Sequence, residues 1–323
     1  MREHDILAAD GTRLRVWRTG ETGRDVLLCP GLGTMPEAWP HLTRPDPGAC
    51  VHSWYHRGTL GSARPADPTR IRLADHVADA LAVLDDAGIE RAVVAGWSVG
   101  VTVAVELASR YPDRVSGLLL VAGTAGDPYG GMFGVLGLPP AARRALAGGA
   151  TRLVRDAGPL LNAVLRRVPV NTATATVLRH SGMMRPASAT ADVVAAGRRF
   201  LTNDWTWYGR LAMALADSPM PDLTKVCCPV TALAGRYDLF ADPRQVAATM
   251  GALPQARFRV LPTSHFLPLE APDELAAELA LLIERVDAVL AAAHWLGRPR
   301  HLVPSPRPSS EPILSGTAYR TLT

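Results

Sequence analysis

The sequence predicts an α/β fold with a mostly parallel sheet, and three observations support that prediction. Short apolar runs typical of buried strands alternate with segments whose apolar residues recur at helical spacing. The segment 114–123 (RVSGLLLVAG) is almost continuously apolar, as expected of a strand covered on both faces of a parallel sheet. The alternation stops after Gly123 and returns near residue 228, which indicates a helical insertion within one large domain.

The first part of the chain reads as a hairpin followed by alternating strands and helices. Asp10 and Gly11 form the dipeptide that favours a tight turn between two strands. Segments 25–31, 49–58 and 91–96 are short and apolar, as in buried strands. Segments 71–87 and 101–112 have helical periodicity; Gly88 and Pro112 mark their ends.

The second part divides the chain into an expected core, cap and tail. Residues 126–222 contain helical patterns and no convincing strand, so we expect them to form a helical cap. Strand character returns at 228–235 and 256–262, and the last long helix should span 272–295. Residues 1–125 and 223–296 would then form the core. Residues 297–323, rich in Pro and Ser, are expected to be a disordered tail.

The charge and hydrophobicity of the sequence argue against a nucleic-acid partner and against insertion into a membrane. The net charge is +4, but no basic stripe interleaved with aromatic residues accompanies it, so we expect no nucleic-acid partner. The charged N-terminus lacks the apolar core of a signal peptide, and no apolar run approaches the ~20 residues of a membrane span. We therefore expect a cytoplasmic protein without stable membrane insertion. The four cysteines lack a C-x-x-C spacing and are interpreted as reduced core thiols.

The stretch AGWSVGV (95–101) places Ser98 between two glycines at the end of an apolar run. One interpretation is packing, in which Gly96 and Gly100 let a helix lie close to a strand. The other is chemical: Ser98 is a nucleophile on a sharp strand-to-helix turn that requires small neighbours. The Gly-x-Ser-x-Gly pattern alone does not distinguish the two interpretations, so residues elsewhere in the sequence are needed to choose between them.

A catalytic serine needs a base and a group that orients the base. Asp238 follows the apolar segment 228–235 by a few residues, and His265 follows the segment 256–262 in the same way. The order Ser, Asp, His is the order expected after such a turn. We predict that Ser98 is the nucleophile, Asp238 the acid and His265 the base.

A tetrahedral intermediate also needs backbone N–H donors for its oxyanion. Val99, directly after the nucleophile and at the start of a helix, should supply one donor. The second should come from the glycine-rich segment CPGLGTMPEAW, with Leu32 as the first candidate and Gly33 as the fallback.

Five segments in this order resemble the α/β-hydrolase superfamily, in the branch of esterase-like serine hydrolases with a helical cap. They are PGLGTMPEAW, HRGTLGSARP, IERAVVAGWSVG, GRYDLFADP and SHFLPLEAPDE, within a similarity that covers about residues 5–295. The resemblance implies an α/β-hydrolase fold and the triad named above, and it implies no cofactor and no metal. The sequence departs from the family pattern at Pro30, Trp97 and Val101.

These observations predict a serine hydrolase that cleaves a carboxylic ester through an acyl-enzyme intermediate. A thioesterase or a carbon–carbon bond hydrolase with the same triad, and a non-catalytic ligand-binding protein, remain alternatives. The eleven Arg against six Asp in 126–222 leave an anionic substrate open, although a solvated surface is the simpler interpretation. Candidate contacts to a small-molecule ester or acyl substrate are Gly33, Trp97, Met132, Phe133, Trp205 and Phe266.

Overall fold

The computed structural model describes residues 1–44 and 48–295. These residues form an eight-stranded sheet with the order β1-β2-β4-β3-β5-β6-β7-β8. Among its strands only β2 runs opposite to the rest, since it pairs antiparallel with β1 and β4 while every other pair is parallel. The predicted mostly parallel sheet is confirmed. The strands are Arg2–Leu7 (β1), Arg13–Thr19 (β2), Arg24–Cys29 (β3), Ala49–Trp54 (β4), Ala92–Trp97 (β5), Val115–Val121 (β6), Val230–Gly235 (β7) and Ala256–Leu261 (β8).

Helices cover both faces of the sheet, so β5 and β6 are buried along their whole length. Successive strand residues point to opposite faces. Val94 therefore packs in the apolar cluster that includes α1 (Leu73–Asp86) and α2 (Val99–Arg110), whereas Val93 packs in the cluster that includes α11 (Pro272–Trp295). The two clusters fix the strand ends from which the site residues project.

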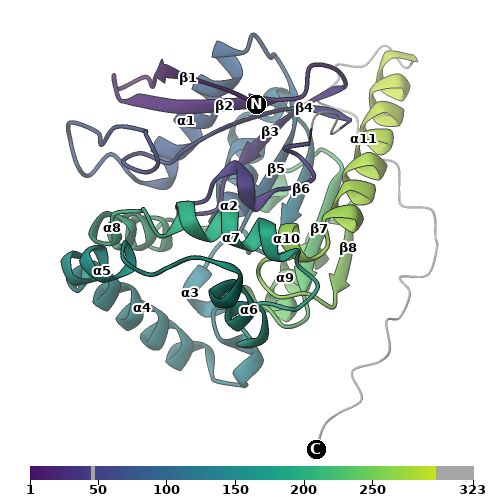
Figure 1. Cartoon of the computed structure of the whole chain (residues 1–323). Helices are drawn as coiled ribbons and strands as arrows, with labels where there is room; N and C mark the ends of the chain where they lie inside the picture. The colour runs from purple at the N-terminus through teal and green to yellow at the C-terminus, as the bar shows by residue number, and fades with distance from the viewer. Residues whose placement is uncertain (45–47, 296–323) are drawn as a thin grey trace, which may run out of the picture.

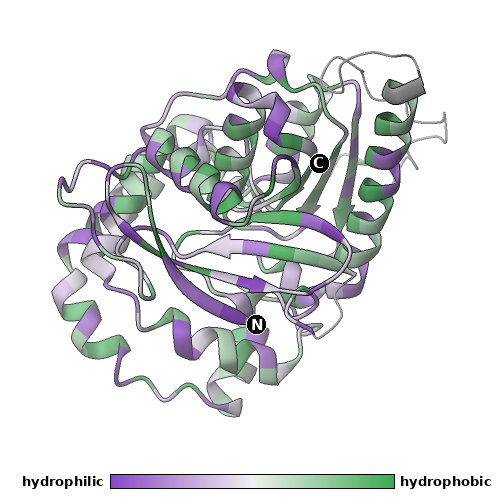
Figure 2. Cartoon of the chain, turned by 90° about the horizontal axis from the view of Figure 1, so that it is seen from above, coloured by the Kyte–Doolittle hydropathy of each residue, from purple (hydrophilic) through white to green (hydrophobic). Residues whose placement is uncertain are grey.

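The edge strand β1 is mostly hydrophilic, as Figure 2 shows for the strand that starts at the N-terminus. Its Asp5 pairs with Arg13 and Arg15 of β2, across the predicted hairpin. Gly11 in the turn has φ of +78°, a conformation that glycine adopts without strain. Charged side chains on an edge strand oppose pairing with another chain.

Residues 126–222 lie between β6 and β7 and, within the described chain, contain helices and no strand. Figure 1 shows these helices grouped together in the lower half of the view. The indole N–H of Trp207 donates to the Arg57 carbonyl at 2.7 Å and so ties the group to the sheet. The helices are Pro128–Gly131 (α3), Pro140–Asp156 (α4), Gly158–Leu165 (α5), Thr172–His180 (α6), Thr190–Phe200 (α7) and Trp205–Ala216 (α8).

The remaining elements are two short helices and four 3-10 turns: Pro243–Gly251 (α9), Leu267–Glu270 (α10), Pro36–Ala38, Pro112–Arg114, Gly134–Leu136 and Leu223–Lys225. None of the helices described is both long and apolar enough to cross a bilayer. The expected tail, residues 297–323, lies outside the described residues. Cys29, Cys50 and Cys228 are buried thiols, but Cys227 is exposed, contrary to the expectation of four core thiols, because it lies in the loop that leads into β7.

Candidate active site

Ser98 lies on a sharp turn between β5, which ends at Trp97, and α2, which begins at Val99. Its backbone has φ 57° and ψ −122°, which is strained for a residue with a side chain. The flanking glycines make this turn sterically feasible. A Cβ on Gly100 would lie 2.1 Å from the Cys29 carbonyl oxygen, and one on Gly96 would lie 2.5 Å from the Gly100 carbonyl oxygen.

The fold brings Ser98, His265 and Asp238 into one hydrogen-bonded chain. The Nε2 atom of His265 lies 2.9 Å from Ser98 Oγ, and its Nδ1 atom lies 2.9 Å from Asp238 Oδ2. Asp238 is fully buried, and its Oδ1 also accepts the backbone N–H groups of Phe240 and Ala241 at 2.7 and 2.9 Å. This arrangement can hold the imidazole with Nε2 free to take the hydroxyl proton.

Trp97, the residue before the nucleophile, holds the backbone of the histidine. Its indole N–H donates to the His265 carbonyl at 3.0 Å, and the side chain is buried. The rings of Phe240 and Phe266 lie 5.0 and 6.0 Å from the imidazole, centroid to centroid. Two of the predicted substrate contacts, Trp97 and Phe266, therefore lie beside His265 itself.

A buried carboxylate braces the loop that carries the histidine. Glu270 accepts the backbone N–H of Ser264 at 2.7 Å and its hydroxyl at 2.6 Å. It also accepts the backbone N–H of Arg185, from the segment between α6 and α7, at 2.7 Å. Sequence reasoning missed this role of Glu270, although the residue lies five positions after His265.

The two predicted oxyanion donors are the first residue of α2 and a residue of the turn that follows β3. Val99 is the first residue of α2, where an amide has no carbonyl partner within the helix. Leu32 lies in a turn closed by the Thr34 N–H on the Gly31 carbonyl at 3.1 Å, and Gly33 in that turn has φ of +65°. Oxyanion stabilisation requires backbone amides in fixed positions, and a helix start and a hydrogen-bonded turn are structures that can provide them.

Asn203, between α7 and α8, connects the inserted helices to this turn. Its Nδ2 donates to the Gly33 carbonyl at 3.0 Å and to the Phe200 carbonyl at 2.8 Å. The ring of Tyr208 lies against the same glycine, because a Cβ on Gly33 would be 3.0 Å from it. Sequence reasoning gave no signal for Asn203, since the contact spans 170 residues.

The hydroxyl of Tyr208 has no hydrogen-bond partner among the described residues, and burial raises the pKa of this phenol to about 12. The phenol is therefore protonated at neutral pH, and its ring carbons lie against Gly33 of the Leu32 turn. Trp205, predicted to contact substrate, packs against Phe200 and Tyr208, with ring centroids 5.4 and 5.2 Å away. Trp205 thus supports the position of Tyr208.

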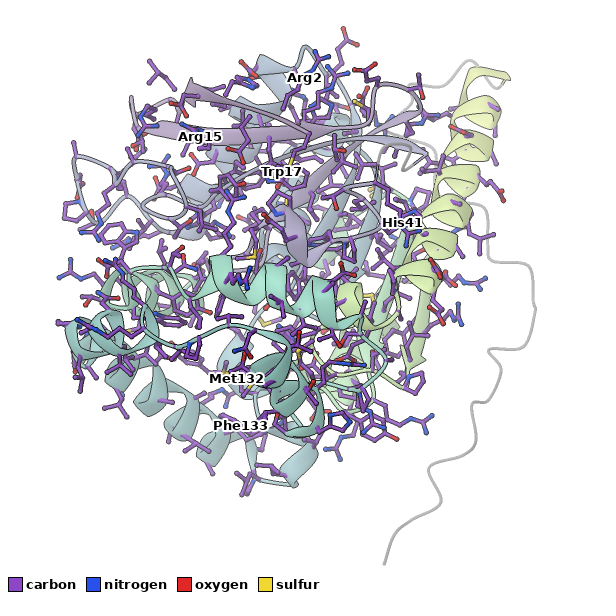
Figure 3. The ribbon with its side chains drawn as sticks, viewed as in Figure 1. Arg2, Arg15, Trp17, His41, Met132 and Phe133 are labelled. Atoms are coloured by element: carbon purple, nitrogen blue, oxygen red, sulfur yellow. The ribbon has the colours of Figure 1, made fainter. Side chains whose placement is uncertain are left out.

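Met132 and Phe133, the other two predicted contacts, lie beside the loop of the predicted acid. The Phe133 N–H donates to the Leu239 carbonyl at 2.6 Å, and the residue has φ of +59°. Figure 3 shows both side chains low in the view among the inserted helices, far from Trp17 on β2.

Two neutral histidines lie beneath the Leu32 turn. His56 Nε2 lies 3.0 Å from the Pro30 carbonyl oxygen, and its Nδ1 lies 3.1 Å from His76 Nδ1. Complete burial lowers the pKa of His56 to about 4 and lowers that of His76 well below the ordinary value. The contact of His56 with the Pro30 carbonyl supports the start of the turn. Because their pKa values are lowered, the two histidines add no positive charge beside the site at neutral pH.

Comparisons with known proteins agree with this architecture. A family model described as alpha/beta hydrolase fold matches residues 26–272. A Caulobacter vibrioides protein to which carbamate hydrolase activity is ascribed (RutD) is 33% identical over 132 residues, which are 40% of this chain and 49% of the relative. Epoxide hydrolase A of Mycobacterium tuberculosis is 33% identical over 114 residues, 34% of this chain and 35% of that relative. The matches span half or less of these curated relatives.

Solved structures extend the likeness over most of the chain. The enol-lactonase from Burkholderia xenovorans LB400 superposes with a TM-score of 0.66 at 22% identity, covering 87% of this chain and 100% of that one. An esterase from Thermogutta terrifontis gives a TM-score of 0.65 at 20% identity, covering 88% and 99% of the two chains. At these identities the likeness shows the shared fold.

Proposed function

The chain belongs to the α/β-hydrolase fold family, and on that premise we propose that it is a serine hydrolase that cleaves a carboxylic ester of moderate size. The single observation that supports this proposal most strongly is the chain of hydrogen bonds from Ser98 through His265 to Asp238. A serine hydroxyl becomes a useful nucleophile only with such an oriented base.

In the proposed reaction His265 removes the proton from Ser98 Oγ, and the oxygen attacks the ester carbonyl carbon. The amides of Leu32 and Val99 bind the resulting oxyanion. His265 then gives the proton to the leaving alcohol, which leaves an acyl group on Ser98. Water, activated by the same imidazole, releases the acid, while Asp238 holds the tautomer and stabilises the imidazolium.

We propose that residues 126–222 act as the cap over this site. The support is the pair Asn203 and Tyr208, which contacts the Leu32 turn from the inserted helices. The unpartnered Tyr208 hydroxyl is suited to donate to a polar group of a small-molecule substrate, and the partly exposed Phe266 offers apolar surface beside His265, whereas Trp97 is buried behind it.

The test is hydrolysis of p-nitrophenyl esters of increasing acyl length by the purified chain. Ser98→Ala should lower turnover by on the order of a million-fold, and a fluorophosphonate should label the peptide that contains Ser98. Ser181→Ala, at an exposed serine of the inserted helices, is the control and should keep both properties.

Activity that survives Ser98→Ala would refute the assignment of the nucleophile. Labelling of Ser98 without ester turnover, but with turnover of thioesters or of a carbon–carbon bond substrate, would keep the triad and change the substrate class. Absence of labelling would favour a ligand-binding protein without turnover.

A further inference from the structure

Three potential metal ligands meet at the end of the sheet opposite the candidate active site. Asp25 is the second residue of β3 and Cys50 the second residue of β4, and the two are register partners in the parallel pair. His52 lies two residues after Cys50, so its side chain points to the same face. Ser98 instead follows the carboxyl end of β5, so this cluster is distinct from the candidate active site.

The spacing of the three donor atoms fits a tetrahedral metal ion. Cys50 Sγ lies 3.3 Å from His52 Nε2, which lies 3.4 Å from Asp25 Oδ1, and all three atoms are within 4.8 Å of one another. A zinc ion with a Zn–S distance of about 2.3 Å and Zn–N and Zn–O distances of about 2.0 Å separates its ligand atoms by about 3.3–3.5 Å. The two shorter separations already match, and rotation of the half-exposed Asp25 side chain can bring the third closer.

The surroundings favour a partly open site. Cys50 and His52 are only 4% and 6% exposed, whereas the side chain of Asp25 is 44% exposed. Solvent can thus reach the cluster past the carboxylate, which leaves a fourth position for water. The guanidinium of Arg18, on the adjacent β2, donates from Nε to Cys50 Sγ at 3.2 Å. Cysteine binds metals as the thiolate, and the Arg18 guanidinium is placed to donate a hydrogen bond to that sulfur.

We propose that Asp25, Cys50 and His52 bind a zinc ion that ties β3 to β4. Binding releases the Cys50 thiol proton to solvent, and Nε2 of His52 and one oxygen of Asp25 complete the protein ligands. The thiolate and imidazole exclude Ca²⁺ and Mg²⁺, which prefer oxygen ligands. The charges of the thiolate and the carboxylate cancel the charge of Zn²⁺. Arg18 adds one positive charge and keeps its hydrogen bond to the sulfur.

The experiment uses the full chain, treated with a chelator, dialysed, incubated with excess zinc and desalted. We expect one zinc ion per chain by elemental analysis, and a thiolate-to-cobalt charge-transfer band when Co²⁺ replaces zinc. Cys50→Ser should lose the band and retain about a tenth or less of the zinc. Cys227→Ser, at the exposed cysteine, is the matched control and should behave as the unchanged chain.

A second variant keeps the test decisive if Cys50→Ser folds poorly. Asp25→Asn preserves the shape of a half-exposed side chain. It should weaken zinc binding by at least about 10–100-fold, because that loss is typical when a residue that only hydrogen-bonds a metal ligand is changed, and Asp25 is proposed as a ligand itself. Stoichiometric zinc in both variants, or no retained zinc and no cobalt band in the unchanged chain, would overturn the proposal. None of these readouts depends on hydrolytic activity.

Discussion

Trp97 directly precedes Ser98, and its indole N–H donates to the backbone carbonyl of His265. Its indole N–H is the contact that a phenylalanine cannot reproduce, while most of the ring surface would remain. The sequence marked Trp97 as a departure from the family pattern and as a candidate substrate contact, and it gave no sign of a contact with His265. The structure gives the departure a physical role, because the imidazole can keep its two hydrogen bonds only if the loop beneath it stays in place.

We expect Trp97→Phe to lower kcat about 5–10-fold with little change in KM, since one buried hydrogen bond contributes about 1–1.5 kcal/mol. Steady-state kinetics with a p-nitrophenyl ester measure this split. Trp54→Phe is the control, because the buried Trp54 indole N–H has no partner among the described residues. Equal kcat for the two variants would show that the Trp97 hydrogen bond does not position His265.

Asn203 is the residue through which the inserted helices hold the Leu32 turn. In Asn203→Asp a carboxylate oxygen would replace the amide donor opposite the Gly33 carbonyl. We expect kcat to fall at least about tenfold, because repulsion would displace the Leu32 amide, which we propose binds the oxyanion.

Asn171→Asp provides an isosteric control for this change. The exposed Asn171 uses its side-chain oxygen to accept the Ala173 and Thr174 N–H groups at 2.9 and 3.2 Å, an acceptor that aspartate retains. Kinetics of the two variants under identical conditions separate the loss of a donor from the addition of a charge. A similar loss in both would remove Asn203 from the proposed support of the oxyanion.

At the scale of elements, the turn from β5 into α2 depends on the absence of side chains at its glycines. Gly100→Ala would place a Cβ against a backbone carbonyl that cannot move away. We expect a loss of about 3 kcal/mol or more in the free energy of unfolding, measured by urea denaturation.

Gly149 in α4 is the matched position, because a Cβ there meets no atom within 4 Å. Gly149→Ala should raise the free energy of unfolding by about 0.5–1 kcal/mol, the difference in helix propensity. A lower free energy of unfolding for Gly100→Ala and a higher one for Gly149→Ala would show a steric requirement at Gly100 and not a general effect of replacing glycine. A small effect at Gly100 would contradict the close approach of α2 to β3.

Helices, strands and turns could be predicted where a short stretch of sequence carries the pattern that specifies them. The last helix begins at Pro272, as predicted, and continues to the end of the described residues at Trp295, and Gly88 follows α1 with φ of +67°. Ser98, Asp238 and His265 could be grouped as a predicted triad because each follows a strand, and the fold does bring the three side chains together. The contacts of Trp97 and Asn203 could not be found in this way, because they join residues 168 and 170 positions apart. Such pairs depend on the order of the strands, which no local pattern encodes.

At the scale of the whole molecule, stability should depend on pH through His56 and His76. Burial lowers both pKa values, to about 4 for His56, while a histidine in the unfolded chain titrates near 6.5. Below about pH 6.5 the unfolded state therefore binds protons that the folded state does not. The free energy of unfolding should fall as the pH drops from about 6.5 towards 4, by up to about 1.4 kcal/mol per pH unit for each histidine.

Urea denaturation at several pH values between about 7 and 5 measures this slope. His76→Gln should make the slope shallower even if it lowers stability at neutral pH. His180→Gln removes an exposed histidine of the inserted helices and is the control. The same slope in the His76 variant and the unchanged chain would contradict the role of the buried pair.

The path of the chain around the inserted helices has an evolutionary consequence. The backbone leaves the sheet after Val121 and returns at Val230 on the neighbouring strand, where Leu118 and Val230 are register partners. Doubling the length of a loop costs only about 0.6 kcal/mol in closure entropy. Apart from anchoring contacts such as those of Asn203 and Trp207, roughly a third of the chain can therefore diverge or shrink between relatives while the hydrogen bonds of β6 and β7 stay the same. On the proposal that these helices form the cap over the site, such modularity allows substrate preference to change while the strands that carry Ser98, Asp238 and His265 stay the same.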